Sequence, residues 1–128
     1  MSRPPRVLVV DDEPLLVSAL IRTLARIGCE GVGAHDGLEA LARVRDDAPI
    51  ELVLCDVRMP NMDGPTLLQE LRAAGASMPF VFLTGYGDHS DAELRAMGAA
   101  AVCGKPTPAA VLREVVRTLL DPMLRPSG

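Results

Sequence analysis

Five short apolar runs alternate along this chain with stretches whose apolar residues recur at helical spacing. This alternation limits the fold more than any other feature. Runs rich in Val, Leu and Phe are typical of strands that are buried on both faces. The runs lie at residues 6–10, 30–34, 50–55, 80–83 and 99–103, and Gly31 and Gly33 weaken the second. The helical stretches lie at about residues 14–28, from 38 to before Pro49, 65–74, 91–97 and 107–120.

Strands that alternate with helices predict an α/β fold, in which right-handed crossovers build a parallel sheet with helices on both faces. A chain of 128 residues is long enough for one domain with a genuine core. We expect a lead at residues 1–5, one domain at 6–120, and a tail or linker stub at 121–128, with no second domain. In the last helix we expect Thr107 as the N-cap and Pro108 at the first helical position.

Aspartates stand at the ends of two of the predicted strands. Asp11 and Asp12 follow the first run, and Asp56 follows the third. Ligands of open α/β sheets bind at the carboxyl ends of the strands, so these acids meet if the two strands are neighbours. Two carboxylates about 4 Å apart repel by roughly 4 kcal/mol near a protein surface, so they require a shared proton, a lysine or a metal ion. Oxygen ligands suit magnesium or calcium, and a shell completed by water and phosphate suits magnesium better.

Two further strand ends carry a hydroxyl and an ammonium group, those of Thr84 and Lys105. Carboxylates, a hydroxyl and an ammonium at one edge match phosphoryl transfer. A carboxylate can attack phosphorus to give an acyl phosphate, while a metal ion, the ammonium and the hydroxyl bind the phosphoryl oxygens. Asp56 is the best candidate for the nucleophile, because it stands alone while Asp11 and Asp12 are better placed to share a metal ion.

Composition excludes several other classes of function. The formal net charge of −4 offers no basic surface for direct contact with nucleic acid. No apolar run is long enough to span a membrane, and the first residues lack the hydrophobic region of a signal peptide. Three scattered cysteines at unpaired spacing indicate neither a zinc site nor a disulfide framework. We therefore expect a cytoplasmic protein without a membrane partner.

Four motifs, in order, resemble those of the receiver domain of two-component response regulators. They are Val9-Val10-Asp11-Asp12-Glu13, Asp56 to Gly64, Leu83 to Asp88, and Lys105-Pro106. The resemblance covers residues 6 to about 120. It implies a flavodoxin-like, five-stranded, doubly wound parallel sheet of order 2-1-3-4-5, with a cis bond between Lys105 and Pro106.

The resemblance also implies roles for individual residues. Asp56 would accept a phosphoryl group from a sensor histidine kinase or a histidine phosphotransfer protein. Lys105 would pair with the acceptor or the phosphoryl group, and Thr84 would turn its hydroxyl toward that group. Mg²⁺, or Mn²⁺ in its place, would bind Asp12, Asp56 and the main-chain carbonyl of Arg58, with Asp11 acting mainly through water. Output would run through a downstream protein, and the family leaves homodimerisation through the fourth and fifth helices open.

Two positions depart from the receiver pattern. Val102 stands where receivers usually have an aromatic residue, and Thr107 stands where many have phenylalanine. We expect the signal to run instead through Thr84, the following loop and the helix from Asp91, with Tyr86 covering part of the missing ring. Arg58 and Tyr86 either shield the acyl phosphate from water or face solvent.

Two other classes of function compete with a phosphorylation switch. A phosphatase with an aspartate nucleophile usually carries an acid two residues further on, and this chain has Arg58 there. We therefore expect no turnover of an external substrate. A phosphate-independent interaction module commonly lacks part of the site, whereas every candidate residue is present here.

Overall fold

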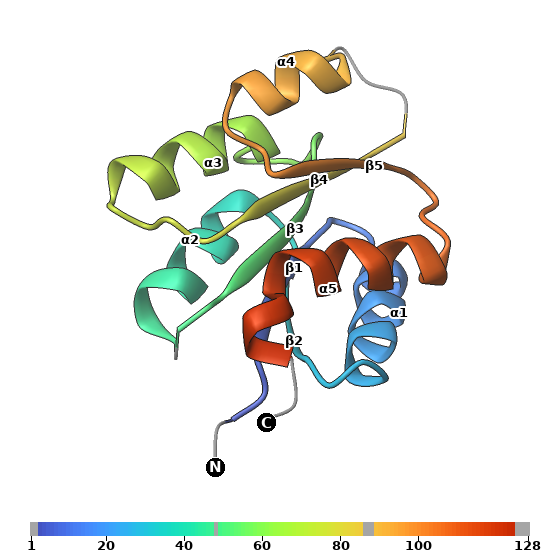
Figure 1. The fold of residues 1–128 in the computed structure, drawn as a ribbon. Helices are drawn as coiled ribbons and strands as arrows, with labels where there is room; N and C mark the ends of the chain where they lie inside the picture. The colour runs from blue at the N-terminus through green and yellow to red at the C-terminus, as the bar shows by residue number, and fades with distance from the viewer. Residues whose placement is uncertain (1–2, 48, 86–88, 125–128) are drawn as a thin grey trace.

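The computed structural model describes residues 3–47, 49–85 and 89–124. Five parallel strands form one sheet of order β2-β1-β3-β4-β5, and helices connect them (Figure 1). The strands are β1 (Arg6–Val10), β2 (Glu30–Ala34), β3 (Leu52–Asp56), β4 (Phe80–Thr84) and β5 (Ala101–Gly104). The helices are α1 (Pro14–Ala25), α2 (Gly37–Asp46), α3 (Gly64–Ala73), α4 (Asp91–Ala96) and α5 (Ala109–Leu124). The predicted fold class and strand order are confirmed.

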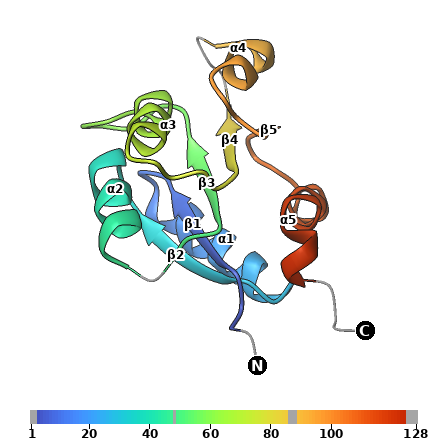
Figure 2. The ribbon, with the colours of Figure 1, turned by 60° about the vertical axis from the view of Figure 1, so that its left-hand side comes forward.

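The sheet separates two hydrophobic cores, so the molecule has three layers. Figure 2 shows α2 and α3 on one side of the sheet and α5 on the other. Successive strand residues point to opposite faces, which is why Val53 and Cys55 pack in the core under α2, α3 and α4, while Leu52 and Leu54 pack under α1 and α5. The near-absence of polar residues from the central strands follows from this burial on both faces.

β1 and β3 are neighbours, with Val10 paired to Cys55. The chain turns from this pair toward β2 on one side and toward β4 on the other. A crevice forms at such a reversal of strand order, outside the carboxyl ends of the strands. The pairing therefore places the residues after Val10 and Cys55 next to each other, as the sequence predicts.

The glycines of β2 make room for α1. A Cβ atom at Gly31 would lie 2.8 Å from Cγ1 of Ile21, and one at Gly33 would lie 2.8 Å from Cγ1 of Val17. Both distances are too short for carbon atoms, so only glycine allows α1 to lie this close to the strand. The strand that the sequence predicts as weak is complete, and its glycines serve the packing of the helix.

The ends of β3, β5 and α5 differ from the prediction. β3 begins at Leu52 and includes Asp56, and β5 occupies Ala101–Gly104, so both lie later than expected. Thr107 as the N-cap of α5 is wrong: its hydroxyl donates to the carbonyl of Gly104, and α5 begins at Ala109. The carbonyl of Pro108 accepts from the N–H of Leu112 at 3.0 Å, which puts Pro108 just before the helix. The helix also continues beyond residue 120, to Leu124.

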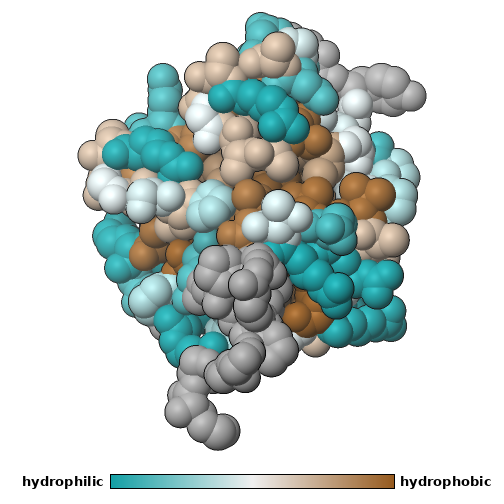
Figure 3. All heavy atoms as spheres, in the orientation of Figure 1, coloured by the Kyte–Doolittle hydropathy of each residue, from teal (hydrophilic) through white to brown (hydrophobic). Residues whose placement is uncertain are grey.

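Apolar side chains reach the surface in several places. Figure 3 shows them across the middle of the face on which α5 lies, with hydrophilic side chains around them. The most exposed large hydrophobic residue among those described is Leu15, at 85%. Within the described part of the chain, no helix combines the length and hydrophobicity needed to cross a bilayer.

The three cysteines, Cys29, Cys55 and Cys103, are free and buried. Burial raises the pKa of each thiol, and for Cys55 the neighbouring charge of Asp56 raises the pKa further. The thiols are therefore neutral at physiological pH, and none is a nucleophile in this structure.

Candidate functional site

Asp11 is the buried anchor of the acidic cluster. It follows β1 directly and is only 1% exposed. Its N–H donates to the carbonyl of Ala34 at 3.1 Å, which continues the pairing of β1 with β2. Its Oδ1 accepts from the N–H of Glu13 at 2.9 Å. Backbone contacts therefore fix both the main chain and the carboxylate of Asp11.

Lys105 joins Asp11 to Asp56. Its Nζ lies 2.8 Å from Oδ2 of Asp11 and 3.2 Å from Oδ2 of Asp56. The N–H of Lys105 donates to the carbonyl of Thr84 at 2.8 Å, and the Lys105–Pro106 peptide bond is cis, as the resemblance implies. The ammonium is thus held over the carboxyl ends of β1 and β3 by the segment that follows β5.

The pKa values of the two partners reflect this arrangement. Burial raises the pKa of the Asp56 carboxyl and the charge of Asp11 raises it further, while the hydrogen bond from Lys105 opposes both. Burial alone lowers the pKa of Lys105, but the neighbouring carboxylates of Asp11 and Asp56 outweigh it and raise the pKa. Lys105 is therefore a stable cation between two carboxylates.

Three carboxylates form a group that fits a divalent metal ion. Asp11, Asp12 and Asp56 each offer an oxygen atom, and these atoms lie within 4.8 Å of one another. Oδ2 of Asp11 is buried and has no well-oriented hydrogen bond, although it lies beside the ammonium of Lys105. An oxygen-only donor set with incomplete hydrogen bonding suits a hard cation such as Mg²⁺. The structure therefore brings together the predicted carboxylate ligands, and their metal-binding role remains a prediction.

The other predicted site residues lie around the same edge. Thr84 ends β4 and pairs with Gly104 of β5, so its main chain lies beside the segment that carries Lys105. Arg58 is exposed in the loop after β3. Val102 is half-buried and packs against the core under α3 and α4. Tyr86 lies outside the described residues, so its predicted roles are untested.

One contact of this region was missed by sequence reasoning. Nδ2 of Asn61, in the loop after β3, donates to Oδ2 of Asp36 at 2.7 Å. The spacing of Asp36 and Glu39 is an N-cap signal that could have located the start of α2. Nothing in the sequence indicates that Asn61 reaches the same carboxylate from 25 residues away.

Comparison with known proteins identifies the family of this chain. The family model of the response regulator receiver domain matches residues 7–117. The chain belongs to the response regulator receiver family. Receivers of known structure share its fold: a response regulator receiver protein from Pseudomonas putida is 30% identical with a TM-score of 0.82, and covers 92% of this chain and 99% of its own. The receiver domain of NtrX from Brucella abortus is 31% identical with a TM-score of 0.82, covering 90% and 98%.

Curated relatives of this receiver are longer proteins. Sensor kinase CckA from Brucella abortus is 35% identical over 125 residues, which are 94% of this chain and 13% of the kinase. Response regulator MprA from Mycobacterium avium is 43% identical over 79 residues, which are 62% of this chain and 34% of the regulator. The chain thus spans about a third or less of these relatives. Receivers similar to this one occur both in a kinase and in a response regulator.

Proposed function

We propose that this receiver takes a phosphoryl group onto Asp56 from a phosphohistidine and signals through phosphorylation-dependent protein contact. A carboxylate oxygen of Asp56 attacks phosphorus and the P–N bond breaks. The electron pair of that bond stays with the ring nitrogen of the donor, which takes up a proton. The product on Asp56 is an acyl phosphate.

The observation that carries this proposal is the placement of Asp56 between a cation and two acids at the edge of the sheet. Its Oδ2 lies 3.2 Å from Nζ of Lys105, and its side chain is 13% exposed, whereas that of Asp11 is 1% exposed. Asp56 is therefore the acid of this ion-paired group that a donor can reach more easily. The ion pair with Lys105 keeps an ammonium beside the position where negative charge arrives.

The remaining residues would bind the phosphoryl group. The ammonium of Lys105 would pair with a phosphoryl oxygen, and the hydroxyl of Thr84 would donate to another. Mg²⁺ or Mn²⁺ held directly by Asp12, Asp56 and the main-chain carbonyl of Arg58, and by Asp11 mainly through water, would supply positive charge to the phosphoryl oxygens. Asp11, fixed by the N–H of Glu13 at 2.9 Å, would hold its place with or without the metal ion.

The proposed donor is a sensor histidine kinase or a histidine phosphotransfer protein, and the proposed recipient of the signal is another protein. The similarity to Sensor kinase CckA and Response regulator MprA supports a place in two-component signalling. We place the exchange in the cytoplasm, a reducing compartment that the three free cysteines fit. The chemistry serves switching, and we propose no turnover of an external substrate.

Intact-mass spectrometry after incubation with acetyl phosphate and Mg²⁺ tests the proposal. Wild type should gain one phosphate adduct that disappears when EDTA is present. Asp56→Asn should gain none. Asp63→Asn is the matched control, because Asp63 lies in the same loop but its side chain caps α3 by accepting from the N–H of Thr66 at 2.9 Å. An adduct on Asp56→Asn, or none on wild type, would reject Asp56 as the acceptor.

A further inference from the structure

We infer that Asp36 and Asn61 form a clamp that positions the loop after β3, residues 57–63, for metal binding. The inference rests on the proposed function, because it takes the main-chain carbonyl of Arg58 in that loop as a metal ligand. Neither Asp36 nor Asn61 belongs to the acidic cluster. Both are therefore positioning residues, which act on the metal ion through the backbone of the loop.

The loop is fixed where it leaves the sheet and enters α3, and its two methionines pack against the core. The N–H of Gly64 donates to the carbonyl of Val57 at 2.9 Å, and the Asp63 carboxylate caps α3. Between these ends, Arg58 and Asn61 are exposed. Exposed positions of a loop open more easily than the buried positions beside them. A contact from α2 to this exposed part of the loop restricts the backbone near Arg58 further.

Asn61 provides such a contact and adopts an uncommon backbone conformation to do so. Its φ is 68°, the one positive φ of a non-glycine residue in the described part of the chain. Asparagine tolerates this left-handed conformation better than most residues. In it, Nδ2 donates to Oδ2 of Asp36 at 2.7 Å. The short distance is typical of a hydrogen bond to an ionised acceptor.

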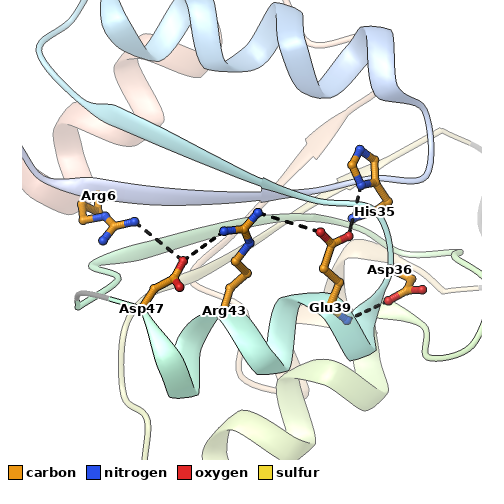
Figure 4. Close-up of polar contacts among 6 residues, drawn as sticks. All are labelled: Arg6, His35, Asp36, Glu39, Arg43 and Asp47. Carbon is orange, nitrogen blue, oxygen red and sulfur yellow. Dashed lines mark hydrogen bonds and ion pairs between the residues drawn. The ribbon is translucent and has the colours of Figure 1, made fainter.

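Asp36 is itself held by the helix that it caps. Its Oδ1 accepts from the N–H of Glu39 at 2.8 Å, at the first turn of α2 (Figure 4). The hydrogen bond from Glu39, and after it that from Asn61, lowers the pKa of Asp36. One carboxylate thus joins two segments, with one oxygen on the helix and the other on the loop.

A second contact between the same segments is independent of the clamp. A Cβ atom at Gly37 would lie 2.6 Å from the carbonyl oxygen of Met62 and 2.7 Å from its Cβ. The first residue of α2 therefore lies against the residue that follows Asn61. Met62 also packs against the core under α2 and α3. The loop consequently rests on the start of α2 over two successive residues.

Loss of the clamp should weaken metal binding and leave the acceptor intact. The three carboxylates are placed by β1 and β3, whose positions do not depend on the loop. The carbonyl of Arg58 lies only three residues before Asn61 and would gain freedom. We expect the affinity for Mg²⁺ to fall about threefold to tenfold, the effect of one ordinary hydrogen bond.

Two variants remove the clamp by different routes. Asn61→Gly keeps the left-handed backbone without strain and deletes the amide. Asp36→Ser keeps a capping oxygen for α2 but is too short to reach Asn61. Isothermal titration calorimetry with Mg²⁺ alone should give a dissociation constant about threefold to tenfold above that of wild type for each variant. The double variant should show the same increase as either single variant. Adduct formation from acetyl phosphate should recover at saturating Mg²⁺.

Ser90→Ala controls for loss of stability without loss of the clamp. It removes the cap of α4, where the Ser90 hydroxyl accepts from the N–H of Glu93 at 3.1 Å. It should lower the Tm and leave Mg²⁺ binding unchanged. Clamp variants that lower the Tm but bind Mg²⁺ as tightly as wild type would overturn the inference alone. A wild type that binds no Mg²⁺ would overturn the metal-dependent function together with it.

Discussion

Nζ of Lys105 lies closer to Oδ2 of Asp11, at 2.8 Å, than to Oδ2 of Asp56, at 3.2 Å. The shorter ion pair is thus with the buried acid that the proposed chemistry does not modify. Asp56, the more accessible partner, accepts a hydrogen bond from the same ammonium, but the ion pair with Asp11 does not depend on it. The cation can therefore stay in place while the charge on Asp56 changes.

Removing the ammonium should lower the stability of the fold and make that stability depend on metal ions. Lys105→Met keeps the length of the side chain but leaves the Asp11 carboxylate, 1% exposed, without its cation. We expect a loss of about 1–3 kcal/mol in the free energy of unfolding. Millimolar Mg²⁺ should restore part of it by supplying positive charge at the same carboxylates. Urea denaturation in EDTA and in Mg²⁺ measures both effects, and equal stability of wild type and variant in EDTA would contradict this account.

Magnesium should stabilise the wild-type protein by an amount that depends on its concentration relative to its dissociation constant. An ion that binds only the folded state adds about 2.7 kcal/mol at a hundred times its dissociation constant. Asp12→Asn should reduce this gain, because Asp12 belongs to the group of three carboxylate oxygens within 4.8 Å. Thermal unfolding over a series of Mg²⁺ concentrations provides the measurement. The same rise in Tm for Asp12→Asn as for wild type would exclude Asp12 as a ligand.

Acid should weaken the start of α2. The pKa of Asp36 is lowered in the folded protein, first by the N–H of Glu39 and then by Asn61. The unfolded chain therefore binds the proton more tightly, so the stabilisation is present above the ordinary aspartate pKa and is lost as pH falls through the lower folded value. Asp36→Asn keeps an acceptor for the cap but cannot titrate in this range. Wild type should lose stability relative to Asp36→Asn as urea unfolding is followed from neutral pH into this acid range, and parallel curves would contradict the prediction.

The glycines of β2 should resist substitution for a steric reason. Gly33→Ala places a Cβ atom 2.8 Å from Cγ1 of Val17, and we expect a loss of about 1–3 kcal/mol. Val17→Ala removes the clashing atom, so the double variant should lose less than the sum of the two single losses. Chemical denaturation of wild type, the two single variants and the double variant measures this coupling. If the two single losses add strictly, the clash is relieved elsewhere in the structure.

Most of the fold and of the acidic cluster could be predicted from the sequence. The strands are buried on both faces, so runs such as residues 6–10 are continuous and easily recognised. The register of Val10 with Cys55 then places Asp11 beside Asp56 without further information. The position of each residue along its strand can be read from the sequence, and that position determines this part of the site.

The contacts that escaped prediction depend on loop conformation. Thr107 precedes a proline at the expected start of a helix, but its hydroxyl donates back to the carbonyl of Gly104, an acceptor that only the turn after β5 brings within reach. Asn61 meets Asp36 because a positive φ directs the loop toward α2. Neither outcome follows from spacing or composition, because each depends on where the backbone turns.

The buried cysteines give this protein built-in reporters of its internal motions. The chain has no tryptophan and a single tyrosine, so intrinsic fluorescence says little about it. Cys55 lies in the core under α2, α3 and α4, whereas Cys29 and Cys103 lie in the core under α1 and α5. A neutral, buried thiol reacts with an alkylating reagent only when its surroundings open. Labelling rates at the three positions would therefore compare the opening of the two layers separately, before and after phosphorylation.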